Sequence, residues 1–366
     1  MTMPGWHSVH IHHYGDATDR LLVDAVRPVM TELAAHGHRC WFARHWRQGP
    51  HVRLHVEAAE EAFRTEVLPV VEARISPYLA ELPAAETDTE AMLPLHRRLA
   101  EAESESGPLT PWYDDNSWHV EAYDDRLTVH GTPEAAALYT DFMCAANDHA
   151  FAVLDRAIQG HVVLAAAFDA MVVVADEFHS DGIAAGYLSF RSHADAYLAQ
   201  KAGGAAQRRA WEAHFQDRAG VLGARLDALL DPASGAVDDA TESLIAALLA
   251  SRVRGLDLRG RGLLPLGEGT AGDDPALMRD VYRELSPFHR ALAENERWLS
   301  EVLPSTWFAL FRLVLNLMYL QFTRMGLTPF QRYFLCYLVA AAVERRTGRQ
   351  AVEVLSDFAA AAGGAG

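Results

Sequence analysis

Cysteine is scarce in this sequence, with three residues of this type among 366, at positions 40, 144 and 336. They lie far apart in apolar surroundings, so they offer neither a disulfide framework nor a paired metal-binding motif, and we expect buried thiols in a reducing cytoplasm. The longest apolar run, residues 162–175, is too short to span a bilayer and contains Asp169, and no signal peptide opens the chain. These absences predict a soluble cytoplasmic protein without a membrane partner.

Basic residues are outnumbered, because 32 lysines and arginines face 49 aspartates and glutamates and give a formal net charge of −17. An acidic surface repels phosphate, which argues against nucleic acid as a partner. Four arginines still fall close together, at positions 39, 44, 47 and 53. The sequence has no Walker motif, no Gly-rich phosphate loop after a strand and no Gly-x-Ser-x-Gly turn, so nucleotide-binding and hydrolase classes lose support.

The first hundred residues combine strand and helix patterns. Polar and apolar positions alternate in residues 6–13 (WHSVHIHH), which places Val9 and Ile11 on one face of a strand and His10 and His12 on the other. The predicted elements are a strand over 6–13, a helix over 17–36, two strands in CWFARHW and HVRLHV joined by a turn at 47–50, and a helix over 58–79 interrupted near Pro69 and Pro77. This order predicts a small α+β layer.

Helical patterns dominate the rest of the chain. Residues 101–117 are predicted to form a polar connection, followed by two short strands in WHVEAY and RLTVH. Thr132 and Pro133 then predict the N-cap and the first turn of a helix. Beyond this point the sequence predicts helices to about residue 250 with a break at Gly203-Gly204, a Gly-rich loop over 254–274, helices over 275–301, 305–324 and 328–346, and a frayed tail, AAAAGGAG.

The predicted fold class is therefore α+β, with an N-terminal mixed sheet layer and helices followed by a largely helical C-terminal half. We expect an α+β portion with hairpins over residues 1–131 and a mainly helical portion over residues 132–366. Neither portion has an obvious independent boundary, so we expect one continuous structural unit.

Residues 310–326 (LFRLVLNLMYLQFTRMG) are apolar almost all round, which predicts a helix buried on most of its surface. Asn316 and Tyr319 are three residues apart and share one face, and Gln321 and Arg324 form a second polar pair at the same spacing. A buried hydroxyl or amide group needs partners. These side chains are therefore either bonded to neighbouring backbone in a core helix or part of a functional site.

Histidines gather in the first predicted strand, at positions 7, 10, 12 and 13. A His-x-His pair places two imidazoles on one strand face, as in some metal sites, but no matching Cys, Glu or His motif elsewhere supports a metal. A solvated or hydrogen-bonded strand face is the simpler interpretation.

A second polar row occurs in HVRLHV, where the side chains of His51, Arg53 and His55 point the same way from a strand beside the one that carries Arg44. The pattern alone leaves two interpretations open. One is a solvated strand face. The other is a surface for an anionic or carbonyl-rich peptide.

Together these motifs resemble the small, stand-alone relatives of the elimination domain of class I lanthipeptide dehydratases. That family opens with a Trp-led strand, a helix, a Phe-x-Arg strand and a His-x-Arg-x-Arg strand, matched here by GWHSVHIHHY, WFARHW and HVRLHV. Its middle motif, Glu-x-x-Arg-Tyr-Gly-Gly before a Pro-Glu helix, is matched by RLTVHGTPEAA, and its last motif, a His followed by Asn-Arg and Leu-Gly, by YLQFTRMGLTP. The resemblance covers most of the chain and implies the elimination-domain fold.

The departures from that family concern its chemistry. The family eliminates glutamate from glutamylated Ser or Thr with the Glu and Arg of the middle motif and the His of the last, where this sequence has Arg126, Val129 and Tyr319. Arg53 is kept, but the second arginine of its strand is His55, and the large glutamylation part is missing. The resemblance therefore implies a retained peptide groove without the older reaction.

One branch of the family, the thiopeptide pyridine synthases of the thiomuracin type, fits this pattern. The resemblance implies a formal aza-[4+2] cycloaddition of two dehydroalanines in an azole-bearing precursor peptide, which closes a macrocycle. Loss of water and of the leader peptide then gives a pyridine, without a cofactor. The implied partner is the modified precursor peptide, with its leader and core, and the oligomeric state stays open, a homodimer included.

Three residues are candidates for catalysis within this resemblance. Tyrosine has a pKa of about 10, so Tyr319 would bind the reacting amide and protonate a leaving group. Ser286, before Pro287, and the nearby His289 would assist, unless they are an ordinary helix cap and a surface histidine. The expected substrate-binding residues are Arg53, His51, Arg44, Asn316, Tyr282 and Trp307, with leader contacts in the first portion.

Two other functions remain open from the sequence. A divergent lyase would form dehydroalanine by glutamate elimination with other residues. A non-catalytic scaffold would bind the precursor peptide and present it to other enzymes.

Overall fold

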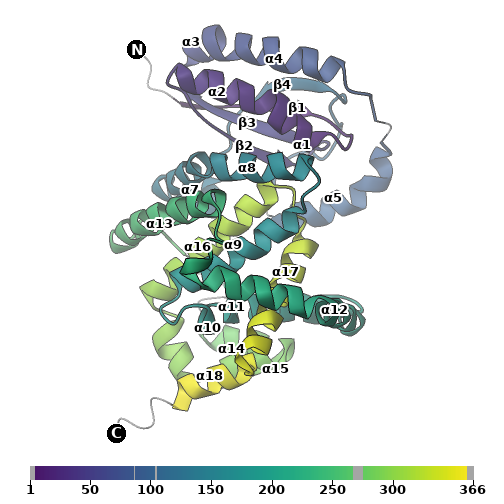
Figure 1. Ribbon diagram of the computed structural model, residues 1–366. Helices are drawn as coiled ribbons and strands as arrows, with labels where there is room; N and C mark the ends of the chain where they lie inside the picture. Colours follow the sequence, from purple (N-terminus) through teal and green to yellow (C-terminus); the bar gives the residue numbers. More distant parts are fainter. Residues whose placement is uncertain (1–4, 86, 104, 267–274, 361–366) are drawn as a thin grey trace. The chain divides into compact units, whose positions relative to one another are not determined.

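The computed structural model describes residues 5–85, 87–103, 105–266 and 275–360 (Figure 1). It confirms the α+β class, because strands occur only near the N-terminus of the described chain and helices make up most of the rest. The chain divides into two compact units. The first contains the residues up to His161 together with Thr323–Gly326, and the second contains Val162–Phe322 and the residues from Leu327 onward.

The first unit extends beyond residue 131, where the sequence places the change of architecture. Two further helices belong to it, α7 (Pro133–Ala145) and α8 (Asn147–Ile158). The first of these helices packs against a strand of the sheet, and the second supplies the buried Phe151 and Leu154 to the same apolar core as the strands. These contacts, which join segments far apart in the sequence, explain why the boundary falls later than expected.

A four-stranded sheet with the order β2-β3-β1-β4 forms the centre of the first unit. Its strands are β1 (Gly5–His12), β2 (Arg39–His45), β3 (His51–Ala58) and β4 (Ser117–Glu121). Each pairing among the described strands is antiparallel, so the sheet is antiparallel rather than mixed. The predicted strands at residues 6–13, 40–46, 51–56 and 118–123 and the β2–β3 hairpin are confirmed.

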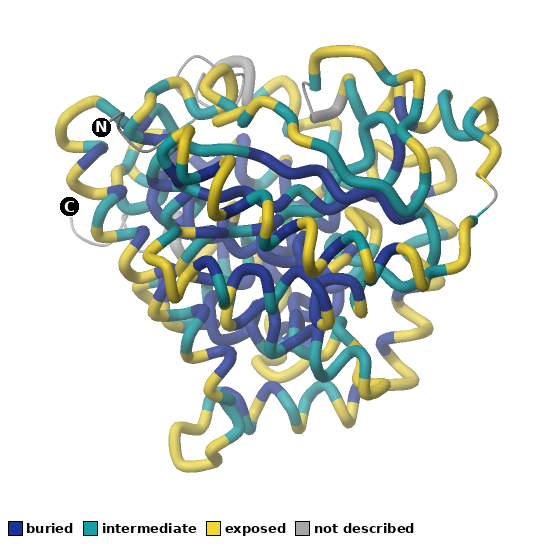
Figure 2. The backbone as a smooth tube through the Cα atoms, turned by 90° about the horizontal axis from the view of Figure 1, so that it is seen from above, coloured by how far each residue is buried: buried dark blue, intermediate teal, exposed yellow. Residues whose placement is uncertain are grey.

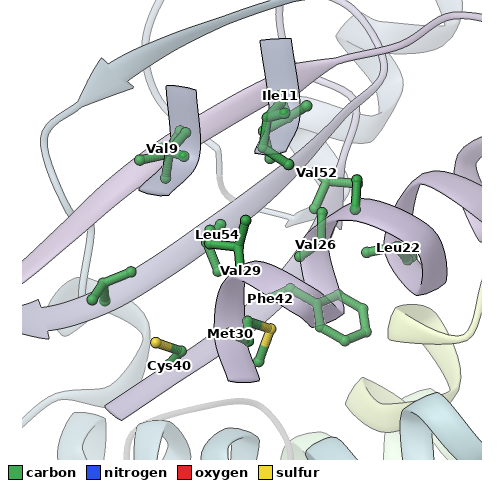
Figure 3. Packing of buried hydrophobic residues seen from close by; sticks show 14 of the residues in the cluster. Val9, Ile11, Leu22, Val26, Val29, Met30, Cys40, Phe42, Val52 and Leu54 are labelled. Atoms are coloured by element: carbon green, nitrogen blue, oxygen red, sulfur yellow. The ribbon is translucent and has the colours of Figure 1, made fainter. Parts of the chain in front are cut away.

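One face of this sheet is apolar, because alternate residues of each strand point towards it. Val9 and Ile11 are fully buried there, opposite Leu54 and Val52, and Phe42 of β2 lies on the same face (Figure 3). Strands β1 and β3 are buried along most of their length, because histidines on their opposite face are buried as well (Figure 2). The apolar face forms the core of the first unit.

Two helical segments cover the apolar face. Their elements are α1 (Thr18–Leu21), the π-helical turn η1 (Leu22–Val26), α2 (Arg27–Ala35), α3 (Glu60–Ala62), the π-helical turn η2 (Phe63–Val67) and α4 (Leu68–Ala80). Pro69 lies in the first turn of α4, which continues without a break from the π-helical turn η2, so the helical segment runs through this proline. Pro77 lies inside α4 without ending it, because the buried Ile75 and Leu79 hold that turn against the core. The interruption expected at Pro77 is therefore wrong.

Two elements on either side of β4 differ from the prediction. Helix α5 (Thr89–Glu103) lies between α4 and β4, and the expected strand RLTVH, which follows β4, is instead the helical turn α6 (Leu127–His130). The carboxylates of Asp124 and Asp125 accept hydrogen bonds from the backbone N–H groups of Arg126 and Leu127, at 2.9 and 3.0 Å. These Asx-type bonds favour a turn over an extended strand. The predicted cap is confirmed, since the Thr132 side chain accepts a bond from the Ala135 N–H of α7.

Helices build the second unit as far as it is described. They are α9 (Val163–Phe178), α10 (Ile183–Gly186), α11 (Leu188–Gln200), α12 (Gly204–Leu230), η3 (Pro232–Ser234), α13 (Asp239–Gly260), α14 (Pro275–Leu285), α15 (Pro287–Glu294), η4 (Trp298–Val302), α16 (Thr306–Arg324), α17 (Pro329–Thr347) and α18 (Ala351–Ala360). The break at Gly203-Gly204 is confirmed, because Gly203 has a φ of +77° just before α12.

Two predictions for the C-terminal half need correction. Residues 254–260, expected in a Gly-rich loop, are the last turns of α13, and the buried Gly255 and Leu258 fix them in the core. The part of that loop at 267–274 and the tail at 361–366 lie outside the described residues. The helix α18, which the sequence does not predict, begins at Ala351.

Helix α16 is buried on most of its surface, as predicted. Leu313, Val314, Leu317 and Met318 are fully buried, whereas Asn316 lies on an exposed strip of the helix. A search of the described helices finds none that is long and apolar enough to cross a membrane.

Candidate functional site

Three helices of the second unit meet at Tyr319 of α16. Only 7% of this residue is exposed, and its phenol oxygen lies 2.9 Å from Nδ1 of His193 on α11. The Sγ atom of Cys336 on α17 lies 3.5 Å from the same oxygen, and the Arg332 guanidinium lies 4.9 Å from the centre of the Tyr319 ring. The phenol is thus enclosed by an imidazole, a thiol and a cation.

The groups around this phenol are neutral at physiological pH apart from the arginine. Burial, together with the neighbouring Cys336, raises the pKa of Tyr319 well above its ordinary value. Burial, together with the charge of Arg332, lowers the pKa of His193 to about 4, and burial raises that of Cys336 to about 12. The Tyr319–His193 pair is therefore a hydrogen bond between two neutral groups, because proton transfer from the phenol to the imidazole would separate charge in a buried place.

A second polar group is built around His289, which is 1% exposed on α15. Its Nδ1 atom lies 2.8 Å from Oγ of Ser286, and its Nε2 atom lies 3.0 Å from Oγ of Ser192. The Ser286 oxygen also accepts the His289 backbone N–H at 3.2 Å, which confirms that Ser286 caps α15. His289 is buried, so the interpretation of this residue as a surface histidine is wrong. Burial lowers the pKa of His289 to about 4, with Asp195 opposing the shift, and the imidazole is neutral.

Consecutive residues of α11 connect the two groups. Ser192 binds His289, and its neighbour His193 binds Tyr319. The structure therefore brings Tyr319, His289 and Ser286 into one polar network through a dipeptide that the sequence analysis did not select. No sequence signal points to this pair, since His193 and Tyr319 are 126 positions apart and α11 has no distinctive motif.

The other residues expected around the catalytic groups divide into two sets. Tyr282 lies beside the network, with its ring 4.9 Å from that of His289 in an edge-on arrangement. Trp307 instead stacks on Phe311 at 5.9 Å and meets the His179 ring at 4.8 Å. Asn316 is exposed, so it does not share the buried environment of Tyr319, although the two are only three residues apart in the helix.

A cavity of about 1070 Å³ opens in the second unit, and Ser286 belongs to its wall. Neither Tyr319 nor His289 belongs to the lining residues of this cavity. Ser286 is thus the member of the network that meets open space, and His289 lies behind it.

The polar face of the sheet in the first unit contains Arg53. Its Nε and terminal nitrogens bind Nε2 of His51 at 3.2 Å and Nδ1 of His45 at 3.0 Å. Burial lowers the pKa of Arg53 to about 10. The guanidinium is therefore held by two neutral imidazoles, and within the described chain it forms no ion pair shorter than 4.0 Å.

Arg44 was expected to bind substrate together with Arg53 and His51, but its side chain does not lie on their face of the sheet. The register pairs Arg44 with Val52, so its side chain starts from the apolar face, opposite to that of Arg53. Its Nε donates to the backbone oxygen of Arg324 at 2.8 Å, and its guanidinium forms an ion pair with Asp19. Arg44 is a structural contact of the first unit, because both donors are engaged within it.

The histidine cluster on β1 is buried rather than solvated. His10 stacks on His51 and His12 is tilted against it, in both cases with ring centres 4.7 Å apart, and both ring nitrogens of His12 are buried without a hydrogen-bond partner among the described residues. In the described part of the chain no group of three or more His, Cys, Asp or Glu residues could hold a metal ion.

The positions that correspond to the middle motif of the family lack the catalytic Glu and Arg of glutamate elimination. Arg126 forms an ion pair with Glu105, which the sequence analysis did not select, and Val129 is exposed. Burial would raise the pKa of Glu105, but the bond to His45 and the charges of Arg126 and Arg53 lower it to about 2. The carboxylate is therefore ionised and occupied by cations.

These observations define a helical protein with a small sheet and an internal phenol–imidazole site, and the comparisons place it in a family. Residues 6–343 match the family described as the C-terminal part of lantibiotic biosynthesis dehydratases, and the chain belongs to this family. The resemblance derived from the sequence motifs is confirmed.

Two solved structures are similar over nearly the whole chain. The pyridine synthase TbtD from thiomuracin biosynthesis is 30% identical, with a TM-score of 0.75 over 94% of this chain and 99% of that one. TsrL is 19% identical, with a TM-score of 0.69 over 96% of this chain and 98% of that one, which shows the same fold. Among curated proteins, a comparison found no significant match.

Proposed function

We propose that this protein is a thiopeptide pyridine synthase. It catalyses the formal aza-[4+2] cycloaddition of two dehydroalanines in an azole-bearing precursor peptide, with loss of water and of the leader peptide. The observation that carries this proposal is the similarity to a pyridine synthase over almost the full length of both chains. The enclosed Tyr319–His193 pair supplies a chemical reason for it.

The reaction needs an amide to react as its iminol tautomer, which requires one proton at the carbonyl oxygen and loss of one from the nitrogen. Tyr319, whose raised pKa keeps it protonated, gives its proton to that oxygen and takes up the proton lost from the nitrogen, so the phenol is unchanged after the tautomerisation. Two carbon–carbon bonds then form, because the nitrogen lies inside the azadiene and both of its ends are carbon atoms, and water and the leader carboxamide leave, each taking a proton. No oxidant is needed, because the two eliminations alone convert the first ring into an aromatic pyridine.

The second polar group has a smaller role in this scheme. The lowered pKa of His289 makes it a weak base, so its imidazole does not hold an extra proton near neutral pH. It instead orients the Ser286 hydroxyl, which meets the cavity. We assign to Ser286 a hydrogen bond to the peptide backbone during the eliminations.

Most of the rate acceleration would come from folding a flexible peptide so that its two alkenes meet. Such positioning supplies on the order of 7 to 11 kcal/mol. Tyr282, next to His289, remains a proposed contact for the core, and Arg53 and His51 remain proposed contacts in the first unit. Trp307, Asn316 and Arg44 were proposed for the same purpose from the sequence; Trp307 packs against Phe311 and His179, Arg44 binds Asp19, and Asn316 is exposed.

A second candidate function is a peptide-binding scaffold without catalysis. One observation favours it: the Tyr319 side chain is buried between α11, α16 and α17 and is only 7% exposed to solvent. A scaffold would need the cavity and the surface but not the phenol. Glutamate elimination receives no such support, since Arg126 and Val129 occupy the positions of its catalytic groups.

Mass spectrometry of a synthetic bis-dehydroalanine azole peptide after incubation with the protein tests the proposal. A pyridine synthase releases the leader as a carboxamide and leaves a macrocycle lighter by water and leader. A scaffold leaves the peptide mass unchanged. A glutamylated peptide in a parallel incubation would instead gain dehydroalanine if the protein were an elimination lyase.

A further inference from the structure

The cavity of about 1070 Å³ in the second unit is larger than a site for one small molecule needs. Its walls come from α11, α12, the N-terminal turn of α15, α17 and α18. Such a volume suits several residues of a peptide in contact with the wall.

More arginines than carboxylates line this cavity. The four arginines are Arg191, Arg208, Arg209 and Arg345, and the three carboxylates are Asp195, Glu212 and Glu344.

Each of these carboxylates already has a partner. Arg191 binds both oxygens of Glu344, at 3.0 and 2.5 Å, and both residues are buried. Arg208 binds Asp195 at 2.7 Å, and Glu212 accepts a hydrogen bond from the Tyr337 hydroxyl.

Two arginines at the cavity remain without an ion pair. Arg209 and Arg345 are exposed, and no carboxylate of the described chain lies within 4.0 Å of either guanidinium; the only contact of Arg345 is a long one, 3.5 Å, to Gln216. Because an exposed arginine is always charged, these two side chains offer positive charge to a ligand.

Three helices also begin at this wall. They are α12 at Gly204, α15 at Pro287 and α18 at Ala351. Helix N-termini carry partial positive charge. Three of their N–H groups are already used, because Ala351 donates to Glu344 at 3.2 Å, His289 donates to Ser286 Oγ at 3.2 Å and Gly204 donates to the Lys201 oxygen at 2.9 Å. The remaining N–H groups add to the field of the arginines.

Apolar side chains complete the wall between these charges. Leu198, Phe215 and Phe288 are each less than 5% exposed yet belong to the lining, with Ala341 and Val352 beside them. The cavity thus alternates cationic groups with apolar surface.

We propose that this cavity binds an acidic, amphipathic segment of the precursor peptide, with its carboxylates on Arg209 and Arg345 and its apolar side chains on Leu198 and Phe215. The inference rests on the proposed function for its assumption of a peptide substrate. It places the peptide beside Ser286, which shares the wall. It also moves leader recognition away from Arg44, which is engaged with Asp19 and the Arg324 backbone.

Fluorescence anisotropy on the full-length protein tests this site without turnover. The probe is a labelled synthetic peptide of alternating Leu and Glu residues, and its control replaces each Glu by Gln. We expect the Glu peptide to bind more tightly and to weaken with salt, because the contacts are charged. The variant Arg209→Glu/Arg345→Glu should lose about tenfold in affinity. Arg64→Glu, an exposed arginine in the first unit, makes the same charge change at a distant place and should leave the affinity unchanged.

Any of four results would refute the proposed site. The Glu and Gln peptides could bind equally well, or the double variant could bind the Glu peptide as tightly as the wild type does. Arg64→Glu could lose as much affinity as the double variant, or the protein could bind inorganic phosphate but neither peptide. Circular dichroism of each variant confirms folding, and single Arg209→Gln and Arg345→Gln variants serve if the double variant does not fold. Because binding is measured without conversion, a protein that binds the Glu peptide but makes no pyridine refutes the proposed function and keeps the site. If the protein makes pyridine but the Arg209→Glu/Arg345→Glu variant binds the Glu peptide as tightly as the wild type, the proposed function is kept and the peptide site is refuted.

Discussion

The Nδ1 atom of His193 lies 2.9 Å from the phenol oxygen of Tyr319. Both groups are neutral, because burial lowers the pKa of His193 and raises that of Tyr319. In a neutral pair the phenol either donates its proton to Nδ1 or accepts one from Nδ1–H. Only the second arrangement leaves the phenol proton available to a substrate, so His193 is expected to be protonated at Nδ1.

This geometry predicts that His193→Asn retains activity better than His193→Gln. The Asn amide lies near the position of Nδ1 and can donate to the phenol oxygen, whereas the Gln amide lies near Nε2. We expect His193→Gln to lose on the order of 10² in kcat with an unchanged KM, and His193→Asn to lose less than about tenfold. Steady-state kinetics by mass spectrometry would measure both. Equal losses in the two variants would show that His193 only fills space.

Tyr319→Phe should abolish pyridine formation while leaving peptide binding intact. The change removes the proton donor but keeps the ring, and general acid groups contribute typically 10²- to 10⁴-fold. Loss of the bonds to His193 and Cys336 should cost roughly 1 kcal/mol of unfolding free energy, measurable by denaturant titration. Wild-type turnover by this variant would favour the scaffold and refute the role of the phenol.

Ser286 offers a test that separates a helix cap from a chemical role. Ser286→Ala removes both the cap and the hydroxyl, and loss of a cap costs about 1 kcal/mol of stability. Ser286→Asn keeps a capping side chain but removes the hydroxyl that lies 2.8 Å from His289 Nδ1. If the hydroxyl takes part in the reaction, both variants lose turnover and only the Ala variant loses stability. Normal turnover by Ser286→Asn would reduce Ser286 to a cap.

The lowered pKa values of His193 and His289 predict how stability depends on pH. Each imidazole is neutral in the folded protein down to about pH 4 but takes up a proton in the unfolded chain below about pH 6.5. The unfolded state then binds more protons, so the free energy of unfolding falls as pH drops from about 6.5 to about 4 and this contribution levels off below that.

Denaturant titrations of the wild type and of His193→Asn across this range check that prediction. The variant lacks one of the two imidazoles, so its loss of stability on acidification should be smaller. An identical slope in both proteins would mean that the His193 environment does not depress its pKa.

Local patterns in the sequence predict much of the fold. The alternation in β1, β2 and β3 yields the strands and their apolar face, because a period of two fixes which residues meet the core. The apolar stretch of α16 predicts a buried helix, and Thr132 before Pro133 predicts the start of α7. Alternation of polar and apolar residues wrongly predicts a strand at residues 126–130. The side chains of Asp124 and Asp125 accept hydrogen bonds from the backbone N–H groups two residues further on, and these bonds favour the turn α6.

The sequence by itself determined the strands, the buried helix α16 and the identity of Tyr319 as an unusual polar group within it, because these depend on neighbours only a few positions away. The tertiary structure alone decided which groups surround that phenol. His193 and Cys336 approach it from other helices, 126 and 17 positions away, and Arg44 turns to the opposite sheet face from Arg53. Contacts between distant segments follow from how whole helices and strands pack, and no local pattern records that packing.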